Sequence, residues 1–395
     1  MARRVLLGRI VPVVFLLFIT LALLPAQTSI DEGIVVPDAG ISALGGYHTT
    51  RTEGVSTLFT NPAGFNTVTP HLAFSDLTLH LKGPVFDITN LVVSSLSGGA
   101  MGDLLTDEAT LNLLRGIYAG LDLSGPVSFA YVGDGLGFGI FNVTDVLFQG
   151  IGPMTLQAKI IEQVILCGGY SFRIPLGSSS HNLDLGMLLK GTLRGESVIT
   201  KSLLELTTLF SSLGADTILN EPFDFISAIG IDAGVLYSYK DVLSFGFVCD
   251  DLFTPILTNS YDSLQAFIDS AEVSPVQGRV PLKLNAGLGW TPRLGTLGRY
   301  ISDLSLMLDY YDILDFLVAP SSAVNPLLHI GFGVELRLLD ILSLRGGFNQ
   351  GLFSAGLGLD LTHFTIDAAM FGAELGTEPG LQPVYNLIIG IHFGT

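Results

Sequence analysis

The chain has 395 residues, of which 48% are hydrophobic and only 14% charged, and its formal net charge is −18 at pH 7. An acidic balance of this size argues against nucleic-acid binding, which needs basic surfaces to meet phosphates. Apart from one run near the start, no apolar stretch is long enough for a spanning helix, so the high hydrophobicity favours strands that cross a bilayer.

Residues 1–26 are typical of a secretory signal peptide. Arg3, Arg4 and Arg9 give a positive start, an apolar run of 15 residues follows at 10–24, and Ala26 suits the cleavage position. A membrane-anchoring helix is the alternative, but the apolar run is short for a span of about 20 residues. We therefore expect this segment to be removed on export.

Residues 27–70 are rich in Gly, Ala and Thr and do not alternate as a strand would. The segment is too polar and glycine-rich to face lipid throughout, so we expect it to fold into the interior of a barrel as a plug. It ends in a run at 54–65 that contains Asn61, Pro62, Ala63 and Gly64. Taken alone, these four residues would also suit an ordinary turn.

From residue 71 onward, apolar side chains occupy every second position in one segment after another, which indicates β-strands. The clearest example is 329–361, where large apolar residues alternate with glycines and charged residues. Soluble sheets also alternate, but apolar faces as clean as these would need a covering layer. A transmembrane barrel needs none, because lipid covers its apolar face. The expected strands are 71–82 (with 84–92 as a possible partner), 126–132, 135–143, 154–160, 164–173, 181–193, 225–239, 241–250, 279–290, 303–310, 329–338, 342–347, 353–361, 364–371 and 384–393.

Three inserts with leucines at helical spacing interrupt the strands, near 101–118, 198–213 and 254–271. Outside the cell they could form an apolar groove for a hydrophobic ligand, or they could pack on one another and cap the lumen. Aromatic residues near strand ends suit the girdles that mark the two membrane interfaces. These are Tyr170, Tyr239, Trp290, Tyr300, Tyr310 and Tyr385.

Charged residues recur at the alternate positions that would face the lumen. They are Lys82, Lys190, Arg279, Lys283, Arg337, Arg345, Asp184, Asp232, Asp303, Asp309, Glu335, Asp360 and Asp367. One interpretation, which we favour, is a salt-bridged, water-filled lumen that holds the plug. The other is that a subset binds a ligand head group, since Arg or Lys suits the carboxylate of a fatty acid.

The two cysteines are expected to be free thiols, although export would permit a disulfide. Strand phase places Cys167 on the inner face. Cys249 shares the phase of Leu243 and Phe245, on the lipid face. Side chains on opposite faces of a wall cannot be joined.

The run 54–65 with Asn61, Pro62, Ala63 and Gly64 resembles the NPAG signature of FadL-type outer-membrane proteins and their PorV-like relatives. The paired segments at 231–247 and 342–361 also resemble strands of these families, and together the resemblance touches about a quarter of the chain. The strand pattern allows 14 to 16 strands, and the resemblance favours fourteen. We therefore expect an all-β, antiparallel transmembrane barrel at 71–395 in the bacterial outer membrane.

The resemblance also implies a function, namely uptake of hydrophobic small molecules such as long-chain fatty acids, with the plug around Asn61, Pro62, Ala63, Gly64 and Phe65 controlling passage. One alternative is a PorV-like barrel with a secretion or envelope protein as its partner. Another is a general porin or a structural surface protein. The chain has no Gly-x-Ser-x-Gly, His-Glu-x-x-His or Cys-x-x-Cys sequence. We expect no catalytic residues, cofactor, metal or nucleic-acid partner.

Overall fold

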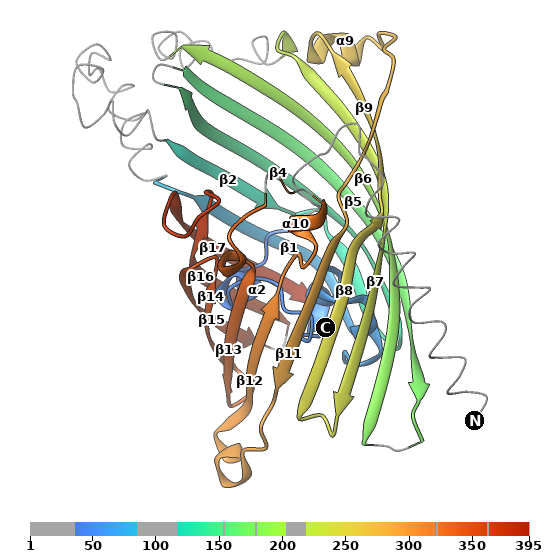
Figure 1. Ribbon diagram of the computed structural model, residues 1–395, viewed down its shortest axis with the longest axis vertical. Helices are drawn as coiled ribbons and strands as arrows, with labels where there is room; N and C mark the ends of the chain where they lie inside the picture. The colour runs from blue at the N-terminus through green and yellow to red at the C-terminus, as the bar shows by residue number, and fades with distance from the viewer. Residues whose placement is uncertain are drawn as a thin grey trace.

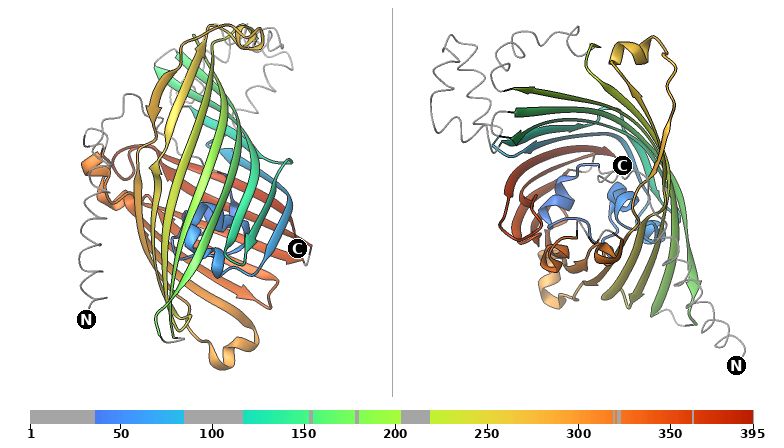
Figure 2. Two further views of the ribbon diagram at one scale, coloured as in Figure 1. Left: turned by 90° about the vertical axis from the view of Figure 1, so that its right-hand side faces the viewer. Right: turned by 45° about the horizontal axis from the view of Figure 1, so that its top comes forward.

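A computed structural model describes residues 36–84, 117–152, 155–177, 180–202, 219–318, 320, 323–361 and 363–394. Its 17 strand segments form one antiparallel sheet. The sheet closes into a barrel because β1 (His71–Lys82) pairs on one side with β17 (Pro383–Gly394) and on the other with β2 (Tyr118–Ser124). Figures 1 and 2 show the closed wall.

Three of the barrel strands are each interrupted once, so the 17 segments make 14 strands, which confirms the predicted fold. β2 and β3 both pair with β1 and β4, β8 and β9 both pair with β7, and β10 and β11 pair with β9 and β8. The other segments are β3 (Phe129–Gly133), β4 (Leu136–Gly152), β5 (Thr155–Pro175), β6 (His181–Ser202), β7 (Phe223–Tyr239), β8 (Leu243–Phe253), β9 (Pro255–Tyr261), β10 (Val276–Arg279), β11 (Lys283–Trp290), β12 (Ile301–Tyr310), β13 (Ile330–Leu338), β14 (Leu342–Asn349), β15 (Leu352–Leu361) and β16 (Phe364–Glu374).

The outer face of the wall is a belt of exposed apolar side chains. Leu166 is 50% exposed and Leu189 54%, whereas their inward-facing neighbours Ile165 and Leu188 are buried. A protein in water does not leave a belt of this extent uncovered, whereas a bilayer covers it. The six aromatic residues expected at the interfaces lie at or near strand ends. None of the helices in the described ranges has the length and apolar character that a membrane-spanning helix needs.

The two ends of the barrel differ. Short turns such as 134–135 and 339–341 join strands at one end, while connections as long as 262–275 and 311–329 join them at the other. In outer-membrane barrels the long connections face outward and the short turns face the periplasm, so we name the two ends accordingly. β5 and β6 have 21 and 22 residues, against 8 to 12 for β12 to β17. One wall therefore rises well above the other at the outer end (Figure 1).

Residues 36–70, here called the luminal segment, lie inside the barrel (Figure 2). They contain two α-helices and two 3-10 helices. α2 (Ala39–Ala43) packs on β14 to β17, and η2 (Pro62–Asn66) packs on β5 to β7. Between them lie η1 (Gly54–Ser56) and α3 (Thr57–Thr60). The remaining short helices are α9 (Leu264–Ile268), η4 (Gly295–Arg299), α10 (Asp315–Val318) and η5 (Pro326–His329).

Two expected helical inserts are wrong where the structure describes them. In the insert 254–271, Pro255–Tyr261 is strand β9 and only Leu264–Ile268 is helical. Pairing with β7 imposes the period of two there, with Ile256 buried beside Ala228 and Leu257 exposed. In the insert 198–213, residues up to Ser202 continue β6 because they pair with β5.

The expected strands 154–160 and 164–173 were wrong as separate strands, since the described residues 155–160 and 164–173 belong to the single strand β5. Four predictions fall outside the described residues: the signal peptide at 1–26, the partner segment 84–92 apart from Pro84, the insert 101–118 up to residue 116, and 203–213 of the second insert. The first nine residues of the expected plug, 27–35, do so as well.

Both cysteines are free. Cys249 pairs with Ala233 on the outer face, as the strand phase predicted, but it is only 1% exposed. Leu282 and Leu284 pack against it, together with Ile313 and Leu314 from the connection after β12. The expectation that Cys249 faces lipid is therefore wrong, because this connection folds back over the outer face.

Candidate functional site

Asn61 joins the luminal segment to the wall. Its Oδ1 accepts a hydrogen bond from the Ala63 N–H at 3.0 Å and so starts η2, while Pro62 occupies the first turn, where its missing N–H costs nothing. Its Nδ2 donates to the Thr49 carbonyl at 2.7 Å and to the Val235 carbonyl of β7 at 3.2 Å. One amide side chain thus links two parts of the segment to a barrel strand.

The wall offers glycines where the segment approaches it most closely. A Cβ at Gly186 of β6 would overlap the Pro62 backbone, and one at Gly234 of β7 would overlap Asn61 Oδ1. A Cβ at Gly137 of β4 would lie 2.8 Å from the fully buried ring of Phe65. At three further glycines around the wall, an added Cβ would likewise overlap the luminal segment, and we call all six glycines the glycine seat. Its members are Gly137, Gly186, Gly234, Gly246, Gly333 and Gly347.

A network of charges fixes the middle of the segment to β13, β14 and β16. Glu53 pairs with Arg337, and Arg51 lies 3.6 Å from Glu335. Arg345 bonds Glu335 at 2.7 Å and also pairs with Asp367. Burial alone would raise the pKa of Glu53, but the charges of Arg51, Arg337 and Arg345 outweigh it and lower the pKa to about 2. The ionised form of Glu53 is therefore strongly favoured.

A second charged anchor is completely buried. His48 Nδ1 lies 2.6 Å from Asp309 Oδ2 of β12, and His48 Nε2 lies 3.0 Å from the Leu44 carbonyl. Both ring nitrogens therefore lie within hydrogen-bond distance of an oxygen, one on the wall and one on the luminal segment. Asp309 Oδ1 also accepts from the N–H and the hydroxyl of Thr49, at 2.8 and 2.7 Å.

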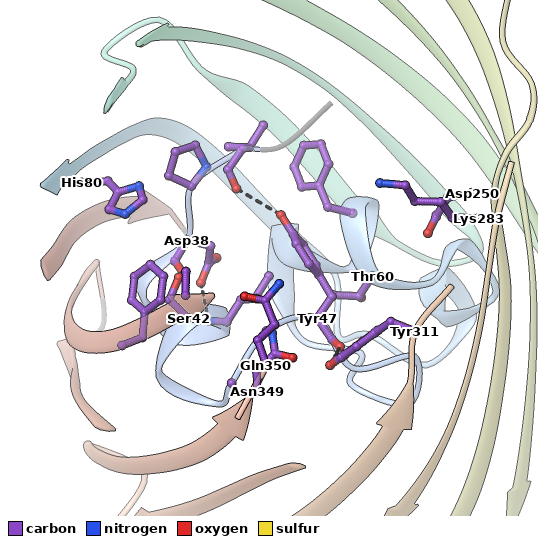
Figure 3. A pocket seen from close by; sticks show the side chains of 18 of the residues that line it. Asp38, Ser42, Tyr47, Thr60, His80, Asp250, Lys283, Tyr311, Asn349 and Gln350 are labelled. Atoms are coloured by element: carbon purple, nitrogen blue, oxygen red, sulfur yellow. Dashed lines mark hydrogen bonds between the residues drawn. The ribbon is translucent and has the colours of Figure 1, made fainter. Parts of the chain in front are cut away.

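The luminal segment divides the interior into two cavities. The outer cavity has about 770 Å³ and lies toward the long connections, and the inner cavity has about 600 Å³ and lies toward the short turns. Val36, Pro37, Asp38 and Phe59 border both cavities, so they form the partition between them. Figure 3 shows His80 on one side of the outer cavity and Asp250 with Lys283 on the other.

Apolar and charged groups share the lining of the outer cavity. Leu58, Phe59, Leu352 and Phe371 contribute apolar surface. Two ion clusters supply half of its Asp, Glu, Lys and Arg residues. Lys82 Nζ lies 2.7 Å from Asp122 Oδ1 and 2.8 Å from Asp145 Oδ2. Lys190 Nζ lies 2.9 Å from Asp232 Oδ1 and 3.0 Å from Asp251 Oδ1. A mixed lining of this kind suits an amphiphilic ligand.

The lumen-facing charges expected from the sequence fall into separate groups. Lys82, Lys190, Lys283 and Asp232 line the outer cavity. Asp303, Glu335, Arg337, Arg345, Asp360 and Asp367 line the inner cavity. Arg173 donates two hydrogen bonds, each 2.9 Å long, to the carboxylate of Asp184, and this ion pair lines neither cavity.

Arg279 was placed on the wrong face. It pairs with Pro255, whereas its neighbour Gly278 pairs with Ile256, which shares the inner face with Ala228. Arg279 therefore faces outward. The irregular residues 280–282 between β10 and β11 reverse the alternation before Lys283, and nothing in the residue types marks that reversal.

Several cavity residues were missed for identifiable reasons. Asp122 lies in β2, which begins where an insert was expected to end, so its strand was not recognised. Asp251 lies where three residues of β8 stand opposite one of β7, so the alternation there carries no signal. Asp145 lies in the part of β4 beyond the expected strand end at 143. The alternation of β4, followed for a few more residues, would have found it.

No family model matches the chain, and no curated protein matches it either. Solved structures do. The toluene transporter TbuX of Ralstonia pickettii is 12% identical with a TM-score of 0.45, covering 91% of this chain and 98% of its own. A FadL homologue of Pseudomonas aeruginosa is 13% identical with a TM-score of 0.40, covering 94% and 98%. The toluene transporter TodX of P. putida is 12% identical with a TM-score of 0.38, covering 90% and 97%.

These likenesses concern the fold alone. The likeness to PorV-like proteins stays a prediction. We therefore infer the ligand class of this chain from the residues that line its own cavities.

Proposed function

We propose that this outer-membrane barrel is a channel for the uptake of hydrophobic small molecules. The observation that supports this most is the outer cavity, which offers Leu58, Phe59, Leu352 and Phe371 to a ligand at the outward end of a membrane-embedded wall. Hydrophobic molecules cross a polar glycolipid surface poorly, because they do not dissolve in it. A protein cavity with apolar walls supplies a path around that surface.

In this proposal the luminal segment is the plug. A ligand in the outer cavity reaches the inner one only when the partition of Val36, Pro37, Asp38 and Phe59 moves. The motif from Asn61 to Phe65 controls passage indirectly. Its contacts with the glycine seat hold the rest of the segment in register, so that the partition can shift without the whole plug leaving.

Uptake in cells tests the proposal. Cells with and without the gene are given labelled toluene, labelled octanol and labelled oleate, so that neutral hydrophobes and a long-chain fatty acid are compared. We expect faster uptake of the neutral compounds when the protein is present. If cells with and without the gene take up each of the three compounds at the same rate, the proposal is rejected. Long-chain fatty acids stay one candidate class, which the oleate arm tests directly.

The alternatives make different predictions. A secretion-associated barrel should retain a protein partner when it is purified in mild detergent. A general porin should give a large, steady ion conductance in planar bilayers. The division of the lumen into two cavities favours the uptake channel over the open pore.

A further inference from the structure

The outer cavity carries more negative than positive groups. Among the described residues that line it, eight are Asp or Glu and four are Lys or Arg. The low-dielectric protein walls around a cavity focus the field of such an imbalance. The lining therefore has an excess of negative groups, which attracts positively charged ligands and repels negatively charged ones.

Most cations of this lining already have a carboxylate partner. Lys82 and Lys190 each lie between two aspartates, and Arg194 bonds Glu196 at 2.7 Å. His80 Nδ1 also lies 2.8 Å from Asp122 Oδ2. Lys283 is in register with Asp250 in the pairing of β11 with β8. A carboxylate entering the cavity would thus find three of the four Lys and Arg side chains already paired.

The lining also has buried hydrogen-bond acceptors without an aligned donor, which favours a ligand that donates hydrogen bonds. Five lining nitrogen or oxygen atoms are buried without an aligned hydrogen-bond partner in the described part of the chain. Four are acceptor oxygens: Oδ1 of Asp122, Asp145, Asp312 and Asn349. The fifth is Nε2 of His80. Asp122 Oδ1 still has the ammonium of Lys82 at 2.7 Å, so the acceptors that most need a donor are those of Asp145, Asp312 and Asn349. Buried acceptors of this kind are normally satisfied, so the cavity lacks donors.

We infer that the outer cavity selects amphiphiles whose head group is a hydrogen-bond donor with a positive charge, such as a primary ammonium, and disfavours those with a carboxylate head. An ammonium brings three donors and a positive charge to a wall that has spare acceptors and spare negative charge. The apolar tail then lies on Phe59, Leu352 and Phe371. This inference rests on the proposed uptake function and narrows its ligand class.

The test compares three probes with the same eight-carbon tail: octylamine, octanol and octanoate. Their binding to the purified full-length protein is measured by equilibrium dialysis at pH 7. We expect octylamine to bind at least about tenfold more tightly than octanoate, with octanol between them, and the ratio to shrink at high salt because screening weakens charge selection. Octanoate binding as tightly as octylamine would overturn the inference.

A double variant locates the effect. Asp145→Asn with Asp251→Asn removes the excess charge but leaves Lys82 paired with Asp122 and Lys190 with Asp232. The ratio of octylamine to octanoate affinity should fall severalfold. The control is Asp360→Asn, which removes one negative charge from the inner cavity. A ratio that moves in the control and not in the double variant would also overturn the inference.

Two further readouts keep the outcomes distinct. Folding of each variant is checked by the change in gel mobility on heating, and Asp145→Asn alone replaces the double variant if the latter does not fold. If octanol binds and enters cells while octylamine and octanoate bind equally, only the inference about the head group fails. If none of the three probes binds and neutral compounds are not taken up, the proposed function fails with it.

Discussion

At the scale of single residues, His48 and Asp309 stand out because their side chains meet at 2.6 Å with no exposed side-chain surface and hold the luminal segment. Removing one partner of a buried hydrogen bond leaves the other unsatisfied, which costs more than the bond itself contributes. The neighbouring Thr49 also depends on Asp309 for two hydrogen bonds. The Asp309 carboxylate therefore makes three of the hydrogen bonds that attach the segment to the wall.

We predict that Asp309→Asn lowers the free energy of unfolding by about 1–3 kcal/mol, because the amide cannot accept from both His48 and Thr49 as the two carboxylate oxygens do. Guanidinium unfolding in detergent, followed by the fluorescence of the single tryptophan, measures it. The control is Asp340→Asn, an exposed turn residue with φ of 57° that Asn also adopts readily. Equal unfolding curves for the two variants would contradict the assigned role of Asp309.

The lowered pKa of Glu53 leads to a pH prediction. A carboxyl whose pKa falls from its usual 4.5 to about 2 on folding contributes stability above pH 4.5 and loses it as the pH falls toward 2. The difference in unfolding free energy between the wild type and Glu53→Gln should therefore stay constant from pH 7 to 4.5 and shrink below that. A difference that disappears already at pH 5 would show that the arginines do not hold Glu53 ionised.

At the scale of elements, the glycine seat lets backbone lie on backbone where η2 crosses β6 and β7. We predict that Gly186→Ala forces η2 off the wall, because the new Cβ would overlap the Pro62 backbone, at a cost of about 1–3 kcal/mol. Hydrogen exchange of residues 57–66 should rise in parallel. The matched control is Gly168→Ala on the outer face, where the nearest atom lies 3.9 Å from the added Cβ. Equal exchange in both variants would argue against the seat.

The elements also show what the sequence can predict. Alternation identified β1 with its correct ends, and β13 within one residue, because each side chain there faces either lipid or the lumen without interruption. It failed at Pro255–Tyr261 and at Arg279, next to interruptions where pairing with β7 and β9, and not residue type, decides which face a side chain takes. An interruption of one residue reverses the phase of everything after it.

The candidate site was predicted only in part for a related reason. Lys82, Lys190 and Lys283 were placed correctly toward the lumen, but their partition between an outer and an inner cavity depends on where the segment crosses the barrel. Arg51, Glu53 and His48 belong to a segment without periodicity, so no pattern indicated which wall residues they meet. The Asn61 motif marked the segment but not its partners.

At the scale of the whole molecule, the partition should limit ion flow through the barrel. Phe59 borders both cavities and packs edge-on against Phe141 at 5.1 Å between ring centroids. We predict that Phe59→Ala joins the cavities and raises the single-channel conductance in planar bilayers severalfold over a low wild-type value. Phe129→Ala, which removes an exposed ring on the outer face, serves as the control. Unchanged conductance in Phe59→Ala would place the barrier elsewhere.

The glycine seat has a consequence for biogenesis. Its members come from β4, β6, β7, β8, β13 and β14, so they surround residues 36–70 on most sides, while the seam between β1 and β17 joins the ends of the sheet. Contacts this close leave no clearance between the segment and the described wall, so threading the folded segment into a finished cylinder would require the strands to part. We therefore expect the hairpins to assemble around a segment that is already in place, an order that matches the order of the chain, interior first and wall second.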